Sequence, residues 1–269
     1  MITLDNGYLI DINRKSSKGN QLKWQKDGIW YKADSNGYEG LSEYVIAKLL
    51  KKSSLQDNEF VDYELETIGY GYQTFNGCKC KSFLKENESI ITLDRLFQNG
   101  YGERLSTILL SIDGVGNRIK FTVDKTEQMT GIDDFGMYLS KILIMDRLFL
   151  NEDRHMNNIA VIYDGNEKFR LCPIFDNGAA LLSDTRQDYP LDVEWNILIK
   201  DVKSKSFDDD FDIQTDILER EYGLGMTFCF DDTDIISIVD EVENYSLAVK
   251  ERVKRVLISQ RNKNMYYFD

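Results

Sequence analysis

Histidine is nearly absent from this chain of 269 residues, in which His155 is the only one. Cysteine occurs four times, but no two cysteines form a Cys-x-x-Cys pair. Structural zinc sites use four Cys or His ligands, commonly in such pairs, so this composition argues against one. Four scattered thiols are typical of a protein from a reducing compartment and not of a disulfide framework.

Positive charge and long apolar runs are also scarce. Lys and Arg number 33 against 46 Asp and Glu, which leaves a net charge of −13, whereas nucleic-acid-binding proteins carry basic clusters. The longest apolar runs fall well short of the roughly 18 residues of a membrane span. Residues 1–15 lack the basic-then-apolar order of a signal peptide. We therefore expect a soluble cytoplasmic protein with no direct nucleic-acid partner and no membrane partner.

The first 84 residues predict a small sheet with one helix. Residues 22–26 and 29–33 flank Asp27-Gly28, a dipeptide typical of a two-residue hairpin turn. Apolar residues at helical spacing predict a helix over 41–52. Further strands are expected at residues 8–12, 60–73 and 77–83.

The rest of the chain predicts mostly helices, although residues 183–212 show no clear period. An apolar stripe predicts a helix over 132–150. Other helices are expected at 91–97, 107–110, 234–243 and 246–263, the last with Ser246 as its N-cap. Two short strands, 158–163 and 169–175, form a second hairpin. The change of pattern near Phe83 predicts an α+β protein with a sheet-rich lobe, residues 1–84, and a larger, mostly helical lobe, residues 85–269.

Two acids bracket the second hairpin, Asp153 on the loop that enters it and Asp176 on the loop that leaves it, and Asn158 follows Asp153 by five positions. Phosphoryl transfer from a nucleoside triphosphate uses one carboxylate to orient the attacking hydroxyl. An Asn and a second carboxylate hold Mg²⁺ against the phosphates. Alone, each residue is more simply a turn residue. Their combined spacing predicts a kinase that uses ATP and Mg²⁺, with Asp153 as the base and Asn158 and Asp176 as metal ligands.

Three further residues are candidates for the same site. His155 is expected to brace the loop or contact the phosphates, although a lone histidine is often simply packed in a core. Lys32 lies inside a strand between bulky residues and is the candidate phosphate anchor, and Glu43, expected to open the following helix, would pair with it. An exposed strand lysine and a first-turn glutamate favoured by the helix dipole are the plainer alternatives.

These motifs, in this order, resemble those of the HipA-like serine/threonine kinases, including the short CtkA-type members. Asp153-x-His155-x-x-Asn158 and Phe175-Asp176-Asn177-Gly178 match the catalytic and metal motifs of that family. The resemblance implies a bilobal protein-kinase-like fold and ATP-dependent phosphorylation of Ser or Thr in a protein substrate.

The resemblance also implies roles for residues that have little signal of their own. Gly19, Gln21 and Lys23 match the family's phosphate loop, and a glycine with successive free backbone amides is suited to cradling phosphate. Ser16 stands where the family autophosphorylates a serine, which expels the loop and silences the enzyme. The remaining matches are Lys81 and Phe83, where the family's hinge contacts adenine, and residues 204–207 with Gln214, after the metal loop.

Several alternatives stay open. HipA itself carries an N-terminal domain that contacts a DNA-binding antitoxin, whereas this chain starts almost directly at the core, so an antitoxin or other regulatory partner in a toxin-antitoxin system is a hypothesis. Asp153-Arg154-His155-x-x-Asn158 is also the motif of phosphoinositide-type kinases, so a lipid or small-molecule kinase is one rival. An ATP-binding pseudokinase is a second. Metal-dependent hydrolysis is a third, although a single histidine supplies few ligands for it.

Overall fold

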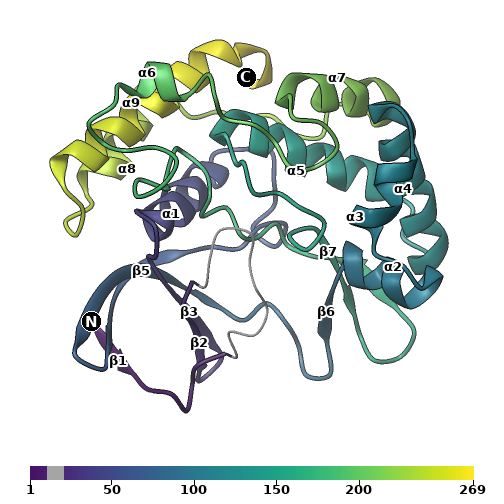
Figure 1. Cartoon of the computed structure of the whole chain (residues 1–269), viewed down its shortest axis with the longest axis horizontal. Helices are drawn as coiled ribbons and strands as arrows, with labels where there is room; N and C mark the ends of the chain where they lie inside the picture. The colour runs from purple at the N-terminus through teal and green to yellow at the C-terminus, as the bar shows by residue number, and fades with distance from the viewer. Residues whose placement is uncertain (11–20) are drawn as a thin grey trace.

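The computed structural model describes residues 1–10 and 21–269, so Ser16 and Gly19 lie outside the described residues. The strands of the larger sheet occupy the lower left of Figure 1, and most helices lie along its top and right. This sheet contains β1 (Ile2–Leu4), β2 (Lys23–Lys26), β3 (Ile29–Ala33), β4 (Glu64–Tyr70) and β5 (Gln73–Lys81).

The order of the larger sheet is β1-β4-β5-β3-β2; β1 pairs in parallel with β4, and the other neighbours are antiparallel. The turn between β2 and β3 has φ values of 52° at Asp27 and 73° at Gly28. Positive φ at both central residues matches the twist of the flanking strands, which is why Asp-Gly is favoured in two-residue hairpins. The predicted hairpin is confirmed, and it places Lys23 directly opposite Lys32.

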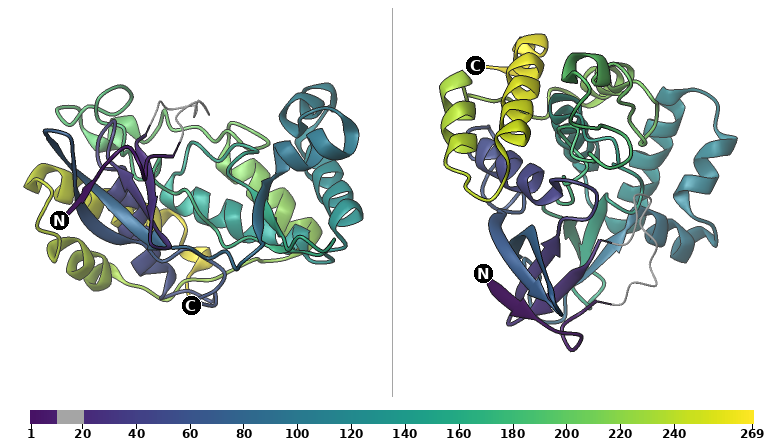
Figure 2. Two further views of the ribbon diagram at one scale, coloured as in Figure 1. Left: turned by 90° about the horizontal axis from the view of Figure 1, so that it is seen from below. Right: turned by 60° about the vertical axis from the view of Figure 1, so that its left-hand side comes forward.

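Helix α1 (Glu39–Leu50) packs against this sheet at very short range. A Cβ atom added to Gly40 would lie 2.6 Å from the carbonyl carbon of Gly77 in β5, so glycine is required at this crossing. The helix is buried on nearly all sides, with nine of its twelve residues buried, because α8 also contacts it. Figure 2 shows the C-terminal helices beside α1.

The larger body combines a three-stranded sheet with helices around a central one, α5, in which twelve of fifteen residues are buried. The sheet has the order β6-β7-β8. Its strands are β6 (Ser89–Thr92), β7 (Ala160–Tyr163) and β8 (Phe169–Leu171). The helices are α2 (Leu93–Tyr101), α3 (Leu105–Ile108), α4 (Val115–Thr130), α5 (Phe135–Phe149), α6 (Trp195–Leu198), α7 (Phe211–Tyr222), α8 (Asp232–Asp240) and α9 (Leu247–Lys263), with the short 3₁₀ turns η1 (Leu109–Ser111) and η2 (Met265–Tyr267).

Several sequence predictions need correction. The strand expected at 8–12 is wrong for its described part: Leu9 forms an isolated bridge with Trp24, and the edge strand is β1. Residues 91 and 92 belong to β6, and the predicted helix begins at Leu93. Helix α1 begins at Glu39, so Glu43 lies in its second turn and does not open it.

Helices α4 and α7 were not assigned from the sequence, and each has an identifiable signal. In α4 the buried residues Ile119, Thr122, Val123 and Thr126 recur at helical spacing, but threonines dilute the apolar stripe. Helix α7 follows an acidic run whose last member, Asp210, is the N-cap and accepts from the backbone of the first turn. Ser246 caps α9 as predicted. In the described part of the chain, no helix is both long enough and apolar enough to cross a membrane.

The connection between α8 and α9 reaches the larger sheet through three polar contacts. The hydroxyl of Tyr245 donates to Asp34 Oδ2 (2.7 Å). Asn244 accepts from the side chain of Asn76 (2.7 Å) and donates to Thr67 Oγ1 (3.0 Å). The C-terminal part of the chain is therefore hydrogen-bonded to strands formed near its beginning.

The shifted pKa of the Asp34 carboxyl leads us to expect that the stability of the protein depends on pH. Burial, reinforced by the charge of Glu39, raises the pKa of Asp34 from 3.8 to about 7. The folded state therefore holds this proton more tightly than the unfolded state, and the free energy of unfolding should fall as pH rises from about 4 to about 7. Asp34→Asn should flatten this dependence and stabilise the protein at pH 8, by at most about 4 kcal/mol, because one pKa unit is worth about 1.4 kcal/mol.

Urea unfolding at pH 5, 6, 7 and 8 would measure this difference. Tyr245→Phe is an informative second variant because it removes a hydrogen bond that lowers the pKa of Asp34. This variant should extend to higher pH the range over which the free energy of unfolding falls, and it should keep the pH dependence itself. Equal pH slopes for the parent and Asp34→Asn would show that Asp34 does not titrate in this range.

Candidate active site

A buried lysine joins the larger sheet to the loop that leaves the second hairpin. Lys32 Nζ, in β3, donates to Glu43 Oε1 of α1 (2.6 Å) and to Asp176 Oδ1 (2.8 Å). It also lies 3.3 Å from the hydroxyl of the buried Tyr63. The second oxygen of Glu43 accepts from the backbone N–H of Asn177 (2.9 Å). A sheet, a helix and the Asp176 loop therefore meet at one ammonium group.

Charge balance explains why this lysine stays protonated although it is buried. Burial pulls the pKa of Lys32 down, but the carboxylates of Asp176 and Glu43 outweigh it and hold the pKa well above its usual value. Burial likewise works against the charge of Asp176, while Lys23 and Lys32 together lower the pKa of its carboxyl far below its usual range. Both partners are therefore ionised at neutral pH.

Lys23 faces the same carboxylate from the neighbouring strand. It lies opposite Lys32 in the β2–β3 register, and its Nζ atom is 3.9 Å from Asp176 Oδ1. Like charges directly opposite each other in a sheet are unfavourable. Asp176 offsets this repulsion, so the pair of lysines forms a cationic face directed at the Asp176 loop.

The backbone after β8 holds an unusual conformation at several positions. Asp176, Leu181 and Leu182 have φ values of 62°, 58° and 60°, a region in which an L-residue other than Asn or Asp is disfavoured by roughly 1–2 kcal/mol. Such residues persist where the surroundings determine them. Here Leu181 donates its N–H to Phe149 O and accepts the hydroxyl of Tyr38. The loop that carries Asp176 is therefore fixed by both halves of the molecule.

Arg154 connects the loop before β7 with the loop after β8. Its guanidinium is fully buried and pairs with the fully buried Asp146 of α5. Nη1 donates to the carbonyls of Asn158 (3.1 Å) and Phe175 (2.6 Å), and Nη2 donates to Asn177 Oδ1 (2.6 Å). The backbones at 158 and 175 are thus held by one nitrogen atom. This role was missed in the sequence, where the available signal was the acid Asp146 within a mostly apolar helix.

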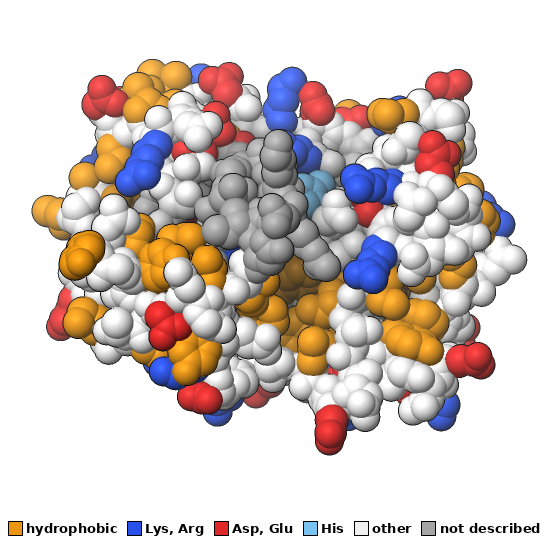
Figure 3. Space-filling model, turned by 60° about the horizontal axis from the view of Figure 1, so that its bottom comes forward, with side chains coloured by type: hydrophobic (Ala, Val, Ile, Leu, Met, Phe, Trp, Pro, Cys, Tyr) orange, Lys and Arg blue, Asp and Glu red, His pale blue; other side chains and the backbone are white. Residues whose placement is uncertain are grey.

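Asp153, His155 and Asn158 lie together on the loop that precedes β7. Asn158 Nδ2 donates to Asp153 O (3.0 Å), and His155 Nε2 is 3.9 Å from Asp153 Oδ2. His155 is half-buried and therefore not a core histidine. Figure 3 shows the single histidine at the surface with Lys or Arg side chains beside it.

Lys205 completes this group from a distant part of the chain. Its Nζ atom lies 2.9 Å from Asp153 Oδ1, although 52 positions separate the two residues. Residues 204–207 match a family stretch in the sequence, but that match assigns Lys205 no role. No local pattern would have placed it against Asp153.

Three other residues that the sequence predicts for the site, Phe83, Lys81 and Gln21, are also among the described residues. Phe83 packs between the two sheets near Phe175, with ring centroids 6.5 Å apart, and its carbonyl accepts from Arg170. The Lys81 side chain is exposed at the end of β5, and Gln21 is half-buried just before β2. Ser16 and Gly19 fall outside the described residues.

The side-chain oxygens of Asp176 and Asn158 suit a hard cation such as Mg²⁺, whose remaining ligands would come from a substrate and water. Among residues 1–10 and 21–269, no three His, Cys, Asp or Glu side chains converge on a common metal position. Mg²⁺ commonly takes one or two protein carboxylates and completes its shell with water and phosphate oxygens. Asn158 donates through Nδ2 to Asp153 O, which directs its amide oxygen away from that carbonyl. Asp176 and Asn158 therefore fit Mg²⁺ only together with an oxygen-rich ligand.

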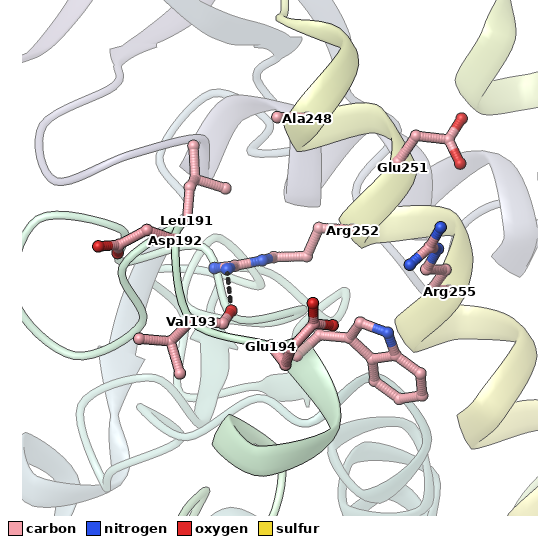
Figure 4. A pocket seen from close by; sticks show the side chains of 9 residues that line it. Leu191, Asp192, Val193, Glu194, Ala248, Glu251, Arg252 and Arg255 are labelled. Atoms are coloured by element: carbon pink, nitrogen blue, oxygen red, sulfur yellow. Dashed lines mark hydrogen bonds between the residues drawn. The ribbon is translucent and has the colours of Figure 1, made fainter.

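A separate shallow pocket lies between residues 191–195 and helix α9 (Figure 4). Arg252 reaches into it, but its guanidinium already donates to the carbonyls of Tyr189, Pro190 and Val193. Acidic side chains line the same pocket beside Arg255. Because the arginine already donates three hydrogen bonds to backbone carbonyls and the charges are mixed, the pocket has the character of a packing defect and not of a second reactive site.

Comparisons with known proteins agree with this geometry at the level of the fold. No protein-family model matches the chain, and no curated protein does. Among solved structures, the chain is similar to the Helicobacter pylori proinflammatory kinase CtkA, with a TM-score of 0.57 and 17% identity over 97% of this chain and 95% of that one. The chain has a bilobal, kinase-like fold. At this identity the likeness concerns the fold alone.

The buried Arg154–Asp146 pair predicts a large effect on stability within this kinase-like fold. Arg154→Met should lower the free energy of unfolding by about 3–5 kcal/mol, because it leaves the Asp146 carboxylate buried without a counter-charge. The matched control is Arg220→Met, which removes an exposed pair with Glu221 and should cost about 0–1 kcal/mol. Urea unfolding measures both, and an Arg154→Met protein within 1 kcal/mol of the parent would contradict the assignment.

Proposed function

We propose that this protein is an ATP-dependent kinase that transfers the terminal phosphoryl group to a Ser or Thr hydroxyl of a protein substrate. The observation that carries the proposal is the buried Lys32 between Glu43 and Asp176. Kinases need a lysine held by a helix glutamate to bind the phosphates and an acid nearby to hold the metal. The fold shared with CtkA supports the same class of reaction.

In this proposal each residue has a defined task. Lys32, with Lys23 beside it, binds phosphate oxygens, and Glu43 keeps Lys32 in place. Asp176 and Asn158 would hold Mg²⁺, which neutralises charge on the phosphates when bound.

Asp153 accepts or orients the proton of the attacking hydroxyl, and His155 braces the loop beside it. Gly19 and Gln21 would contribute to the phosphate loop, and Lys81 and Phe83 to adenine binding.

Two rival functions use the same residues. A lipid or small-molecule kinase would employ the same lysine and acids, and the choice of a protein hydroxyl rests on the resemblance to HipA-like kinases. An ATP-binding pseudokinase would bind the nucleotide without transfer. The complete ionic set around Lys32 and the presence of Asp153 favour a catalyst, because a binding switch has no need of a base. The proposal also includes a toxin-antitoxin role, which rests on the resemblance to HipA-like kinases, and a cytoplasmic location, which rests on the composition of the chain.

Substitutions of the two acids separate binding from catalysis. Asp153→Asn and Asp176→Asn should each reduce phosphoryl transfer by at least roughly 100-fold, which is the lower range for loss of a general base. Asp176→Asn should also weaken magnesium-dependent ATP binding, because it removes a charged ligand. Asp153→Asn should leave that binding unchanged, because Asp153 faces the hydroxyl and not the metal.

The measurements are transfer from labelled ATP to a library of Ser- and Thr-containing peptides, and calorimetric titration with ATP and Mg²⁺. Asp133→Asn, an exposed acid, is the matched control and should behave as the parent. Full turnover in either active-site variant would refute the assigned roles. Binding of ATP by a parent that transfers to none of these peptides would instead favour one of the two rival functions.

Control by self-modification is the remaining part of the proposal. Ser16 precedes the candidate phosphate loop, and a phosphate there would add nearly two negative charges beside the triphosphate. The parent should therefore lose activity and gain one phosphate within residues 14–20 during long incubation with ATP, whereas Ser16→Ala should stay active. Peptide mapping by mass spectrometry tests this, and inactivation of both proteins at one pace would rule out self-silencing while leaving the kinase proposal intact.

A further inference from the structure

Lys205 forms an ion pair with the proposed base Asp153, and the proposed function gives this lysine no task. Its ammonium contacts Asp153 Oδ1 at 2.9 Å, and the Asp153 side chain is 11% exposed whereas that of Lys205 is 43% exposed. An exposed ion pair between flexible side chains contributes little. This pair differs because the Asp153 carboxylate is almost enclosed. Little water reaches that carboxylate, so the ammonium group of Lys205 stabilises its negative charge more than it would at an exposed site.

The segment that carries Lys205 is held on both sides of it. Ser206 Oγ donates to Arg154 O (2.7 Å), which attaches the segment to the loop that bears Asp153. Ser204 Oγ accepts from Gln214 Nε2 of α7 (2.8 Å), and both of these residues are buried. The backbone of Lys205 is therefore fixed relative to Asp153, which reduces the entropy lost when the side chain forms its ion pair.

Lys203 shows what an unconstrained lysine in the same segment looks like. It pairs with Asp209 at the same distance, 2.9 Å, but the two side chains are 69% and 73% exposed. The two lysines are two positions apart and have the same chemistry and pairing distance, yet Lys205 alone of the two contacts an almost enclosed partner.

We propose that Lys205 is a positioning residue for phosphoryl transfer: it holds the Asp153 carboxylate in the orientation in which that group receives the acceptor hydroxyl. The inference rests on the proposed function. Because Asp153 would contact the hydroxyl directly, only the Asp153 carboxylate stands between Lys205 and the attacking oxygen. A hydrogen bond between two charged groups is short and directional, so it fixes the carboxylate more firmly than a neutral partner would.

The test compares Lys205→Met, Lys205→Arg and the matched control Lys203→Met. Initial rates of transfer from labelled ATP would be measured with three acceptors: a library of Ser- and Thr-containing peptides, the protein itself and water. Lys205→Met should lower kcat roughly 10- to 100-fold, which stays within the loss expected for the base itself. Its KM for ATP, its affinity for ATP with Mg²⁺ and its melting temperature should match the parent.

Lys205→Arg should recover at least a third of the parent kcat because it restores the charge, and Lys203→Met should equal the parent. Three results would overturn the inference while leaving the proposed function in place. These are an unchanged kcat in Lys205→Met, a rise in KM for ATP without a fall in kcat, and no recovery by Lys205→Arg. A parent that transfers to none of the three acceptors would instead overturn the proposed function, and the role of Lys205 with it.

Discussion

The Arg154 guanidinium is fully buried, so its N–H groups must find partners inside the protein, because an unpaired buried donor is costly. Its acceptors are the Asp146 carboxylate, two backbone carbonyls and the Asn177 side chain. Arginine is suited to this place because its planar fork presents several donors in fixed directions. The loops that carry Asp153 and Asp176 are consequently positioned relative to α5, the most buried helix of the larger body. The geometry of the candidate site depends on this one group.

The contacts between the two halves of the molecule are ionic and specific around the site. Lys32 joins the sheet to Asp176 across 144 positions of sequence, and Glu43 of α1 reaches Asn177 across 134. Helix α1 is also enclosed by the sheet, by α8 and by the loop at 180 and 181, to which Ser42 and Tyr38 donate. A helix buried on several sides cannot rotate away without exposing apolar surface. The Lys32–Glu43 pair is thus held by packing as well as by charge.

The candidate site is richer in positive charge than the chain as a whole. The protein carries a net charge of −13, yet Lys23, Lys32 and Lys205 all lie within 4 Å of one of the two acids, Asp153 and Asp176. A few cations concentrated at one place are sufficient to attract a polyanionic ligand, whereas the surrounding negative charge disfavours nucleic acid and anionic lipid surfaces. This distribution suits the nucleotide that the proposed function requires.

Features that depend on neighbouring residues could be predicted from the sequence. The Asp27-Gly28 hairpin follows from the positive φ that both positions need, the long helix around α5 from its apolar stripe, and the Ser246 cap from the helix start. Asp153, Asn158 and Asp176 were proposed from the sequence because their spacing matches a known chemical task. Helix α4 and the edge strand β1 were missed because their patterns are weak over short distances.

Tertiary structure alone decided which of these residues meet. Nothing local distinguishes Lys205 from Lys203, since both are lysines in a polar segment; the anchoring of Ser204 and Ser206 gives Lys205 its enclosed partner. Asp34 acquires its raised pKa because burial and the charge of Glu39 disfavour its ionised form, and Tyr245, 211 positions away, opposes this by donating a hydrogen bond that lowers the pKa. Burial and charge act through space and not along the chain. The sequence therefore determined the first hairpin turn, several of the helices and the residues proposed for the site, whereas folding decided the partners that hold each charged group in place.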